Sequence, residues 1–327
     1  MNPSANTLFQ TLLKAARPWS LLAGVLLYAL GGGVATYLGR SIDWPTYWIG
    51  QAIITMLQIG CYFLREYFDR VNQPPFESEI RIPRARQDAP KPPAGQGLPE
   101  PDDGRADEEI PPVRAPRAAF VQVAATAFTI GTALTVLLLA QGALNPASFV
   151  ILALAFVLVL LYSIPPFRLV YSGYGELALA VLVANLFPAF AYLLQTGELH
   201  RLLAMLTFPL TFLYLASALA RSLQHYMEDL RLERNTMLTR LGWQRGMSIH
   251  NILVLAAYLL LAGSVIAGLP RSLALPAFLS MPVGLFQIWQ INSIANGAKP
   301  RWRVLALTAM ATLALMAYFI NLALWTS

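Results

Sequence analysis

The sequence contains a single cysteine, Cys61, and few charged residues. One cysteine excludes an intramolecular disulfide and a metal cluster held by several thiolates, so packing is the role we expect for Cys61. Only 12% of the residues are charged, whereas 57% are hydrophobic, and the mean hydropathy is +0.54. This balance excludes an ordinary soluble domain and indicates a polytopic integral membrane protein.

Long apolar runs occur throughout the chain and predict its fold class. A helix needs about 20 mostly apolar residues to cross a bilayer, and nine windows of the sequence meet that need. They are 17–39, 45–64, 118–141, 146–163, 174–196, 200–223, 247–268, 272–292 and 303–325. Because a helix satisfies its own backbone in lipid, we expect an all-α bundle of nine transmembrane helices in one domain, 1–327. Residues 1–16 lack the apolar core of a cleavable signal, so the first span should remain in the protein.

Basic residues are distributed unevenly over the connections between these windows. If the nine spans alternate, only Arg40, Arg201 and Arg271 lie on one side, and the other 20 of the 23 lysines and arginines lie on the opposite side. Basic connections stay in the cytoplasm, so we expect a cytoplasmic N-terminus and an external C-terminus, in the inner (plasma) membrane. The net charge of +6 needs no further cause and indicates no nucleic-acid partner.

One long connection differs in composition from the rest. Residues 87–109 combine prolines and glycines with mixed charges and contain few apolar residues. Such a composition cannot bury enough apolar surface to fold. We therefore predict a disordered cytoplasmic loop here, inserted in the transmembrane domain.

Acidic residues gather at the ends of two apolar runs. LREYFDR ends the second run and places Glu66 and Asp69 on one helix face. QHYMEDLRLER follows the sixth run, and helical spacing puts Arg221, His225 and Asp229 on one face. If the two helix ends converge, they form one acidic site. Alternatively, each run only solvates a helix terminus.

Two prolines end the fourth apolar run, in the sequence YSIPPFRLVYSGYGEL that begins at Tyr162. Pro-Pro cannot continue a hydrogen-bonded helix, so a loop should follow. That loop places Arg168 among Tyr162, Tyr171 and Tyr174. A forked guanidinium with phenol donors suits an anionic group, although a basic loop with interfacial tyrosines has the same composition.

Several motifs together resemble those of the UbiA superfamily of membrane prenyltransferases. RPWSLL, from Arg17, is similar to the family's opening RP element, and EYFDR, from Glu66, to its first Asp-rich motif. YSIPPFRL and GYGEL resemble its third-loop signature, and TMLTRLG resembles the segment after its second Asp-rich motif. Within the superfamily, EYFDR followed by Pro-Pro-Phe is most similar to the 1,4-dihydroxy-2-naphthoate polyprenyltransferase branch.

The resemblance implies an activity and a set of site residues. A polyprenyl diphosphate would lose pyrophosphate, and an aromatic acceptor such as a quinone precursor would capture the allylic cation. Carboxylates on two helix ends would hold Mg²⁺ against the diphosphate, arginines would add donors, and the apolar bundle would take the prenyl tail beside membrane lipid. The residues that the resemblance implies are Asp69, Asp229 and His225 for catalysis; Arg168, Tyr162, Arg65 and Arg221 for substrate; and Glu66, Asp69, Asp229 and Glu233 for the metal.

The sequence departs from the family pattern at several of these positions. Arg65 stands at the asparagine position of the first motif, and Gln73 stands where its third acid is expected. The second motif can be aligned with either His225 and Asp229 or Asp229 and Glu233 as its two acids. Val170 replaces a lysine that commonly follows the YSxPPxR sequence. These departures leave open a non-catalytic protein of the same fold that binds a lipid or a partner.

Overall fold

The structure is a computed structural model that describes residues 11–13, 15–72 and 117–327. Within these ranges, nine helical spans are long and apolar enough to cross a membrane, as the sequence predicts. The predicted disordered loop, 87–109, lies outside the described residues. The spans are α2 (Pro18–Tyr37), α3 (Trp44–Asn72), α4 (Arg117–Ala140), α5 (Pro146–Ser163), α6–η2–α7, α8 (Arg201–Leu223), α11 (Trp243–Ile266), α12–α13 and α14 (Trp302–Thr326).

Two of the spans are divided into segments. The fifth consists of α6 (Gly175–Val181), the π-helical turn η2 (Leu182–Leu186) and α7 (Phe187–Thr196). The eighth consists of α12 (Arg271–Phe278) and α13 (Met281–Ala295). Three short helices lie between spans: η1 (Leu169–Tyr171), α9 (Tyr226–Arg231) and α10 (Met237–Leu241). The described chain is therefore almost entirely helical, as expected where lipid offers the backbone no hydrogen bonds.

Proline and asparagine fix several helix ends. Pro18 and Pro146 stand in the first turns of α2 and α5, where a backbone N–H has no partner in the helix. The side chain of Asn145 caps α5 by accepting a hydrogen bond from the N–H of Ser148 at 2.8 Å. At its other end α5 stops at Ser163, two residues before the Pro-Pro pair, as the sequence predicts.

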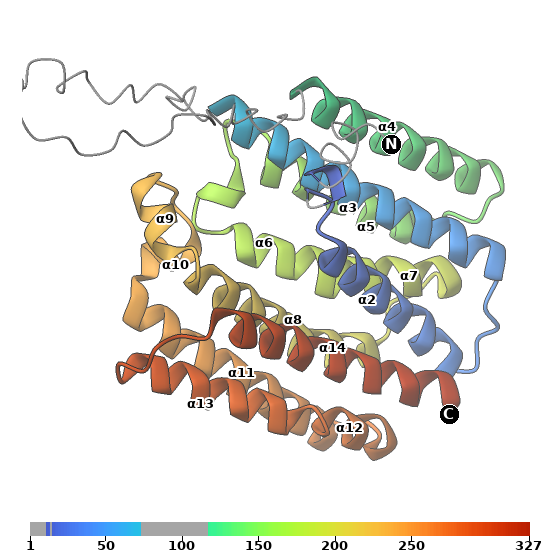
Figure 1. The fold of residues 1–327 in the computed structure, drawn as a ribbon. Coiled ribbons are helices and arrows are strands. Elements are labelled where there is room, and N and C mark those ends of the chain that lie inside the picture. Colours follow the sequence, from blue (N-terminus) through green and yellow to red (C-terminus); the bar gives the residue numbers. More distant parts are fainter. Residues whose placement is uncertain (1–10, 14, 73–116) are drawn as a thin grey trace, which may run out of the picture.

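The sixth span, α8, lies at the centre of the bundle and is its most buried span. It packs against α6, α11 and α14, while α2 packs between α7 and α14 (Figure 1). The third span, α4, packs on α3 at the edge of the bundle and is the least buried. Most of its surface is thus left for lipid.

Glycine permits the close contact between α2 and α7. A Cβ atom on Gly31 would lie 2.1 Å from the backbone oxygen of Pro188. On another side of α2, the carbonyl of Leu26 accepts a hydrogen bond from Asn321 of α14 at 3.0 Å. Small residues often let the backbones of membrane helices approach closely, and Gly31 does so for α2 and α7.

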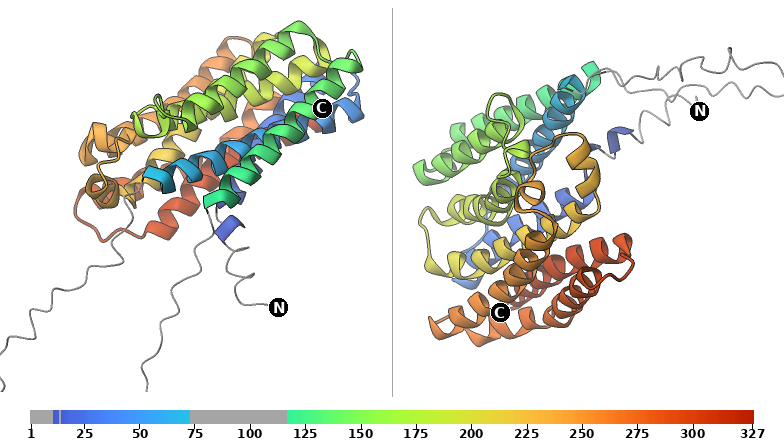
Figure 2. Two further views of the ribbon diagram at one scale, coloured as in Figure 1. Left: turned by 90° about the horizontal axis from the view of Figure 1, so that it is seen from above. Right: turned by 90° about the vertical axis from the view of Figure 1, so that its left-hand side faces the viewer.

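Several helix ends meet at one end of the bundle, which we call the loop end. Here α3 and α8 end, α6, α11 and α14 begin, and α9 and α10 lie beside them (Figure 1, left). Viewed from this end, α9 and α10 lie in front of the helix ends (Figure 2, right). A β-bridge between Ser172 and Asn235 joins the segment after α5 to the segment after α9. The C-terminus of the chain lies at the opposite end.

Candidate functional site at the loop end

The loop after α5 folds against the end of α3. Arg168, in the left-handed region with φ 37°, donates a hydrogen bond to the carboxylate of Asp69. The hydroxyl of Tyr171 donates to Asp69 Oδ2 at 2.9 Å, and Arg65 Nε lies 3.5 Å from the same oxygen. Asp69 therefore joins the second span to this loop, and three partners surround its carboxylate.

Beside this junction lies a cavity of about 840 Å³. Residues from the start of α2, from α3, α5, α6, α8, α9 and α14, and from the connecting loops line it. Its apolar lining includes Val170, Leu179, Ala218, Ala306 and Met310. Its polar and aromatic lining includes Arg17, Arg65, Arg221, Arg234, His225, Glu176, Glu228, Asp229, Tyr62, Tyr162, Tyr171 and Tyr214. The lining of the cavity thus has an apolar part and a charged part.

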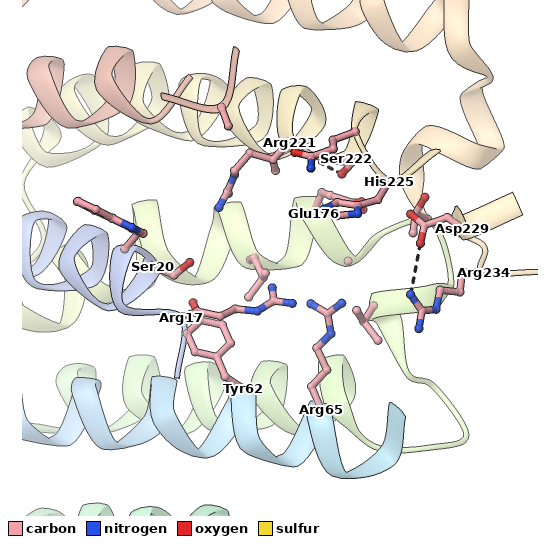
Figure 3. Close-up of a pocket in the computed structure, with 18 of the residues that line it drawn as sticks. Arg17, Ser20, Tyr62, Arg65, Glu176, Arg221, Ser222, His225, Asp229 and Arg234 are labelled. Atoms are coloured by element: carbon pink, nitrogen blue, oxygen red, sulfur yellow. Dashed lines mark hydrogen bonds and ion pairs between the residues drawn. The ribbon is translucent and has the colours of Figure 1, made fainter. Parts of the chain in front are cut away.

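Guanidinium groups from three elements face this cavity. In Figure 3 the side chains of Arg17 and Arg65 lie close together, and Arg221 approaches from α8 on the other side. Arg65 Nη1 donates to Tyr162 Oη at 3.0 Å, and Arg221 Nε donates to the carbonyl of Ser217 at 3.2 Å. The positive charge of Arg65, together with burial, lowers the pKa of Arg17. These groups are arranged to receive negative charge.

Each carboxylate that lines the cavity has a partner. Asp229 Oδ1 lies 3.5 Å from Arg234 Nη1 (Figure 3), and Glu228 Oε2 lies 3.5 Å from His225 Nδ1. Glu176 Oε2 accepts a hydrogen bond from the N–H of Met237 at 3.3 Å. Burial raises the pKa of Asp229, and the charge of Arg234 offsets part of this effect. The acids therefore order the segment around α9 and α10.

The predicted site residues divide into two groups. The structure places Arg65, Tyr162, Arg221, His225 and Asp229 in the lining of the cavity. It does not place Glu66, Asp69, Arg168 or Glu233 there. Asp69 and Arg168 instead bind each other, and Glu233 is exposed in the turn after α9, with φ 51°.

The residues implied for Mg²⁺ do not assemble a binding site in this arrangement. Among the described residues, no three histidine, cysteine, aspartate or glutamate side chains lie close enough to hold a metal ion. Mg²⁺ requires oxygen ligands in near-octahedral geometry, whereas the cavity presents four guanidinium groups and three carboxylates that already have partners. The carboxylate set therefore does not fit the ion. This differs from the converging acidic site that the sequence suggests, because Asp69 turns towards Arg168 and Tyr171.

The sequence patterns alone do not assign site roles to Arg17, Arg234 or Glu176, which the structure places in the cavity lining. Arg17 precedes the first span, and a basic residue there is counted with the other cytoplasmic charges. Its position in the RPWSLL motif was the available signal. Glu176 is an acid at the start of an apolar span, which is a costly position that marks a site. Arg234 belongs to a charged run in which no single residue stands out.

Comparison with known proteins agrees with this architecture. The sequence model of the UbiA prenyltransferase family matches residues 112–307, which is more than half of the chain. The 1,4-dihydroxy-2-naphthoate octaprenyltransferase of Bacillus subtilis (strain 168) is 24% identical over 122 residues, 37% of this chain and 39% of that protein. The chain thus aligns with well under half of the length of this curated relative.

Solved structures of a UbiA homolog from Archaeoglobus fulgidus are similar over nearly the whole chain. The structure bound to GPP and Mg²⁺ has a TM-score of 0.62 at 16% identity and covers 97% of this chain and 99% of its own. The structure bound to DMAPP and Mg²⁺ has a TM-score of 0.63 at 16% identity, covering 96% and 99%. At such identity the likeness concerns the fold. Together with the family match, it confirms the resemblance seen in the sequence motifs: the chain belongs to the UbiA prenyltransferase family and is an integral membrane protein.

Proposed function

We propose that this protein transfers a polyprenyl group from its diphosphate to an aromatic acceptor such as a quinone precursor. The observation that carries the proposal is the cavity of about 840 Å³, in which guanidinium groups lie beside an apolar wall. Guanidinium groups suit a diphosphate, and apolar side chains suit an isoprenoid tail. The ligands named for the A. fulgidus homolog and the acceptor named for the B. subtilis relative belong to the same chemical classes.

The charged wall supplies what the bond-breaking step requires. When the C–O bond of an allylic diphosphate breaks, negative charge grows on the departing pyrophosphate and positive charge on the prenyl carbon. Donors fixed in place, such as Arg65 and Arg221, stabilise the leaving group without reorganising. The apolar wall excludes water, which would otherwise capture the cation.

The acceptor completes the reaction by forming a carbon–carbon bond. Its ring carbon attacks the prenyl cation, and the ring then loses one proton, so that the products are the prenylated acceptor, pyrophosphate and one proton. His225 lines the cavity with its imidazole partly exposed, and in this proposal it receives the proton or orients the acceptor. Asp229 holds Arg234 at the same wall, and Asp69 acts indirectly by fixing Arg168 and Tyr171.

Mg²⁺ accompanies the diphosphate in the structures of the A. fulgidus homolog. In this chain the lining carboxylates already have partners. In this proposal the arginines of the lining, rather than a metal ion, take up the charge of the leaving group.

A transfer assay tests the proposal. Purified protein in lipid is incubated with a labelled prenyl diphosphate and one acceptor in each reaction, either 1,4-dihydroxy-2-naphthoate or one of a panel of other phenolic acids. The products are separated and identified by mass spectrometry. Prenylated acceptor that disappears in Arg221→Gln and persists in Arg245→Gln supports the proposal. Arg245 is an exposed arginine outside the cavity lining and serves as the matched control. Bound label without transfer to any acceptor would favour the non-catalytic, lipid-binding alternative.

A further inference from the structure

We infer that the guanidinium groups of Arg17, Arg65 and Arg221 bind the diphosphate directly, so that its binding to this protein does not require a bridging divalent metal. The inference rests on the proposed function, since it specifies how the same cavity holds the same substrate. In a metal-bridged site, metal ions held by carboxylates contact the phosphates, whereas here the arginines contact them.

The three arginines come from separate parts of the chain and meet at one cavity. Arg17 immediately precedes α2, Arg65 lies near the end of α3, and Arg221 lies near the end of α8. The rings of Tyr62 and Tyr162 lie under Arg17 and Arg65, with 5.8 and 5.9 Å from ring centroid to guanidinium carbon. Aromatic faces hold such side chains in place and leave their N–H groups free to donate.

Charge pairing distinguishes these arginines from the carboxylates. Among the described residues, neither Arg17 nor Arg221 forms an ion pair with an acid. Arg65 is 3.5 Å from Asp69 through Nε, while its Nη1 binds a neutral phenol. Arg17 and Arg65 carry like charges that repel each other, and this repulsion, together with burial, lowers the pKa of Arg17. An anion placed between them would relieve that repulsion.

The carboxylates show the opposite pattern. Glu228 and Asp229 face His225 and Arg234, and Glu176 accepts a backbone N–H. A metal ion at these oxygens would have to displace those partners and would lie in the field of four cavity arginines. The partners of the acids thus favour a cavity that binds anions.

A diphosphate matches this wall better than a single carboxylate does. Each guanidinium presents a planar fork that fits two oxygens of a phosphate group, and three forks exceed what one carboxylate can occupy. A carboxylated acceptor has the same kind of oxygen, so the two ligands must be tested separately. The phosphates of lipid headgroups are a third source of such oxygens, and purification in a sugar-based detergent removes these lipids.

The test is an equilibrium binding titration of the full chain. An unreactive prenyl thiolodiphosphate, inorganic pyrophosphate and 1,4-dihydroxy-2-naphthoate are each titrated by calorimetry, once with Mg²⁺ and once with EDTA. We expect the Kd of the thiolodiphosphate and of pyrophosphate to change less than about tenfold on removal of Mg²⁺. Arg17→Gln and Arg221→Gln should each raise that Kd by about tenfold or more in both buffers, since a charge-assisted hydrogen bond is lost.

Control variants separate binding from folding. Arg245→Gln should bind like the wild type, and Arg17→Lys, which keeps the charge but loses the fork, should fall between the wild type and Arg17→Gln. A Kd that rises about tenfold or more in EDTA, or Arg17→Gln and Arg221→Gln variants that bind like Arg245→Gln, would overturn the inference. The inference would also be overturned if the acceptor binds tightly at these arginines while neither the thiolodiphosphate nor pyrophosphate does.

The outcomes for the inference and for the proposed function are distinct. Transfer in the presence of Mg²⁺, combined with loss of binding in EDTA, removes the inference and leaves the function intact. Binding in EDTA without transfer to any acceptor supports the inference and removes the function.

Discussion

Tyr171 donates a hydrogen bond to Asp69 at 2.9 Å across 102 residues of sequence. Arg168 binds the other oxygen of the same carboxylate. Asp69 belongs to the acidic motif that the sequence suggested for metal binding, yet in this fold its carboxylate fastens the loop after α5 to the end of the second span. That loop carries Tyr171 and Val170 into the cavity wall.

Asp69→Asn should destabilise the protein, because the amide removes the charge that compensates Arg168. Loss of a charged hydrogen bond in a partly buried site costs about 1.5–3 kcal/mol. The midpoint of thermal unfolding in detergent measures the effect. Glu233→Gln, which removes an acid at an exposed position, serves as the control and should unfold like the wild type. Equal midpoints for all three proteins would contradict the structural role of Asp69.

Gly31→Ala should also destabilise the bundle, for a steric reason. The new Cβ would lie 2.1 Å from the backbone oxygen of Pro188, so α2 and α7 would have to separate. Overpacking of this kind costs about 1–3 kcal/mol. Gly263→Ala is the matched control, because its Cβ would meet nothing within 4 Å, and alanine favours a helix over glycine by about 1 kcal/mol. The account of the α2–α7 contact fails if both substitutions shift the unfolding midpoint in the same direction.

The stability of the loop end should depend on the protonation of Asp229. Burial raises the pKa of this carboxyl, so the folded protein binds its proton more tightly than the unfolded chain does. The free energy of unfolding should therefore fall as the pH rises from about 3.9, the ordinary value, through the folded pKa. The charged groups that face Asp229 are Arg234, His225 and Glu228, and Arg234→Gln should widen this pH window.

Unfolding midpoints across this pH range test the prediction for Asp229. Asp229→Asn should lose the fall in stability with rising pH that the wild type shows in this range. An unchanged pH profile in Asp229→Asn would mean that another group is responsible.

The orientation in the membrane is a further prediction from the basic residues. A reporter active only in the cytoplasm, fused after Ser327, should be inactive, because the loop end carries most of the arginines and should face inward. The same reporter placed after Ala298, in the connection between α13 and α14 at the loop end, should be active. The reverse pattern would invert the proposed topology and place the cavity outside.

The sequence predicts the spans because each apolar run must cover the same membrane thickness, whatever its neighbours are. It also predicts the break after Ser163, since proline acts locally. It does not predict where the carboxylate of Asp69 points, because its partner Arg168 is 99 residues away and the contact exists only in the folded chain. The role of Arg17 is not predicted from the sequence either, because it depends on two further guanidinium groups that α3 and α8 bring to the same cavity.

The most direct test of the central claim is an experimental structure of the protein with an unreactive prenyl thiolodiphosphate bound. We expect the two phosphate groups between Arg17, Arg65 and Arg221, and the prenyl chain along Leu179 and Met310. A diphosphate bound elsewhere, or only a lipid tail in the cavity with no phosphate at these arginines, would contradict the account.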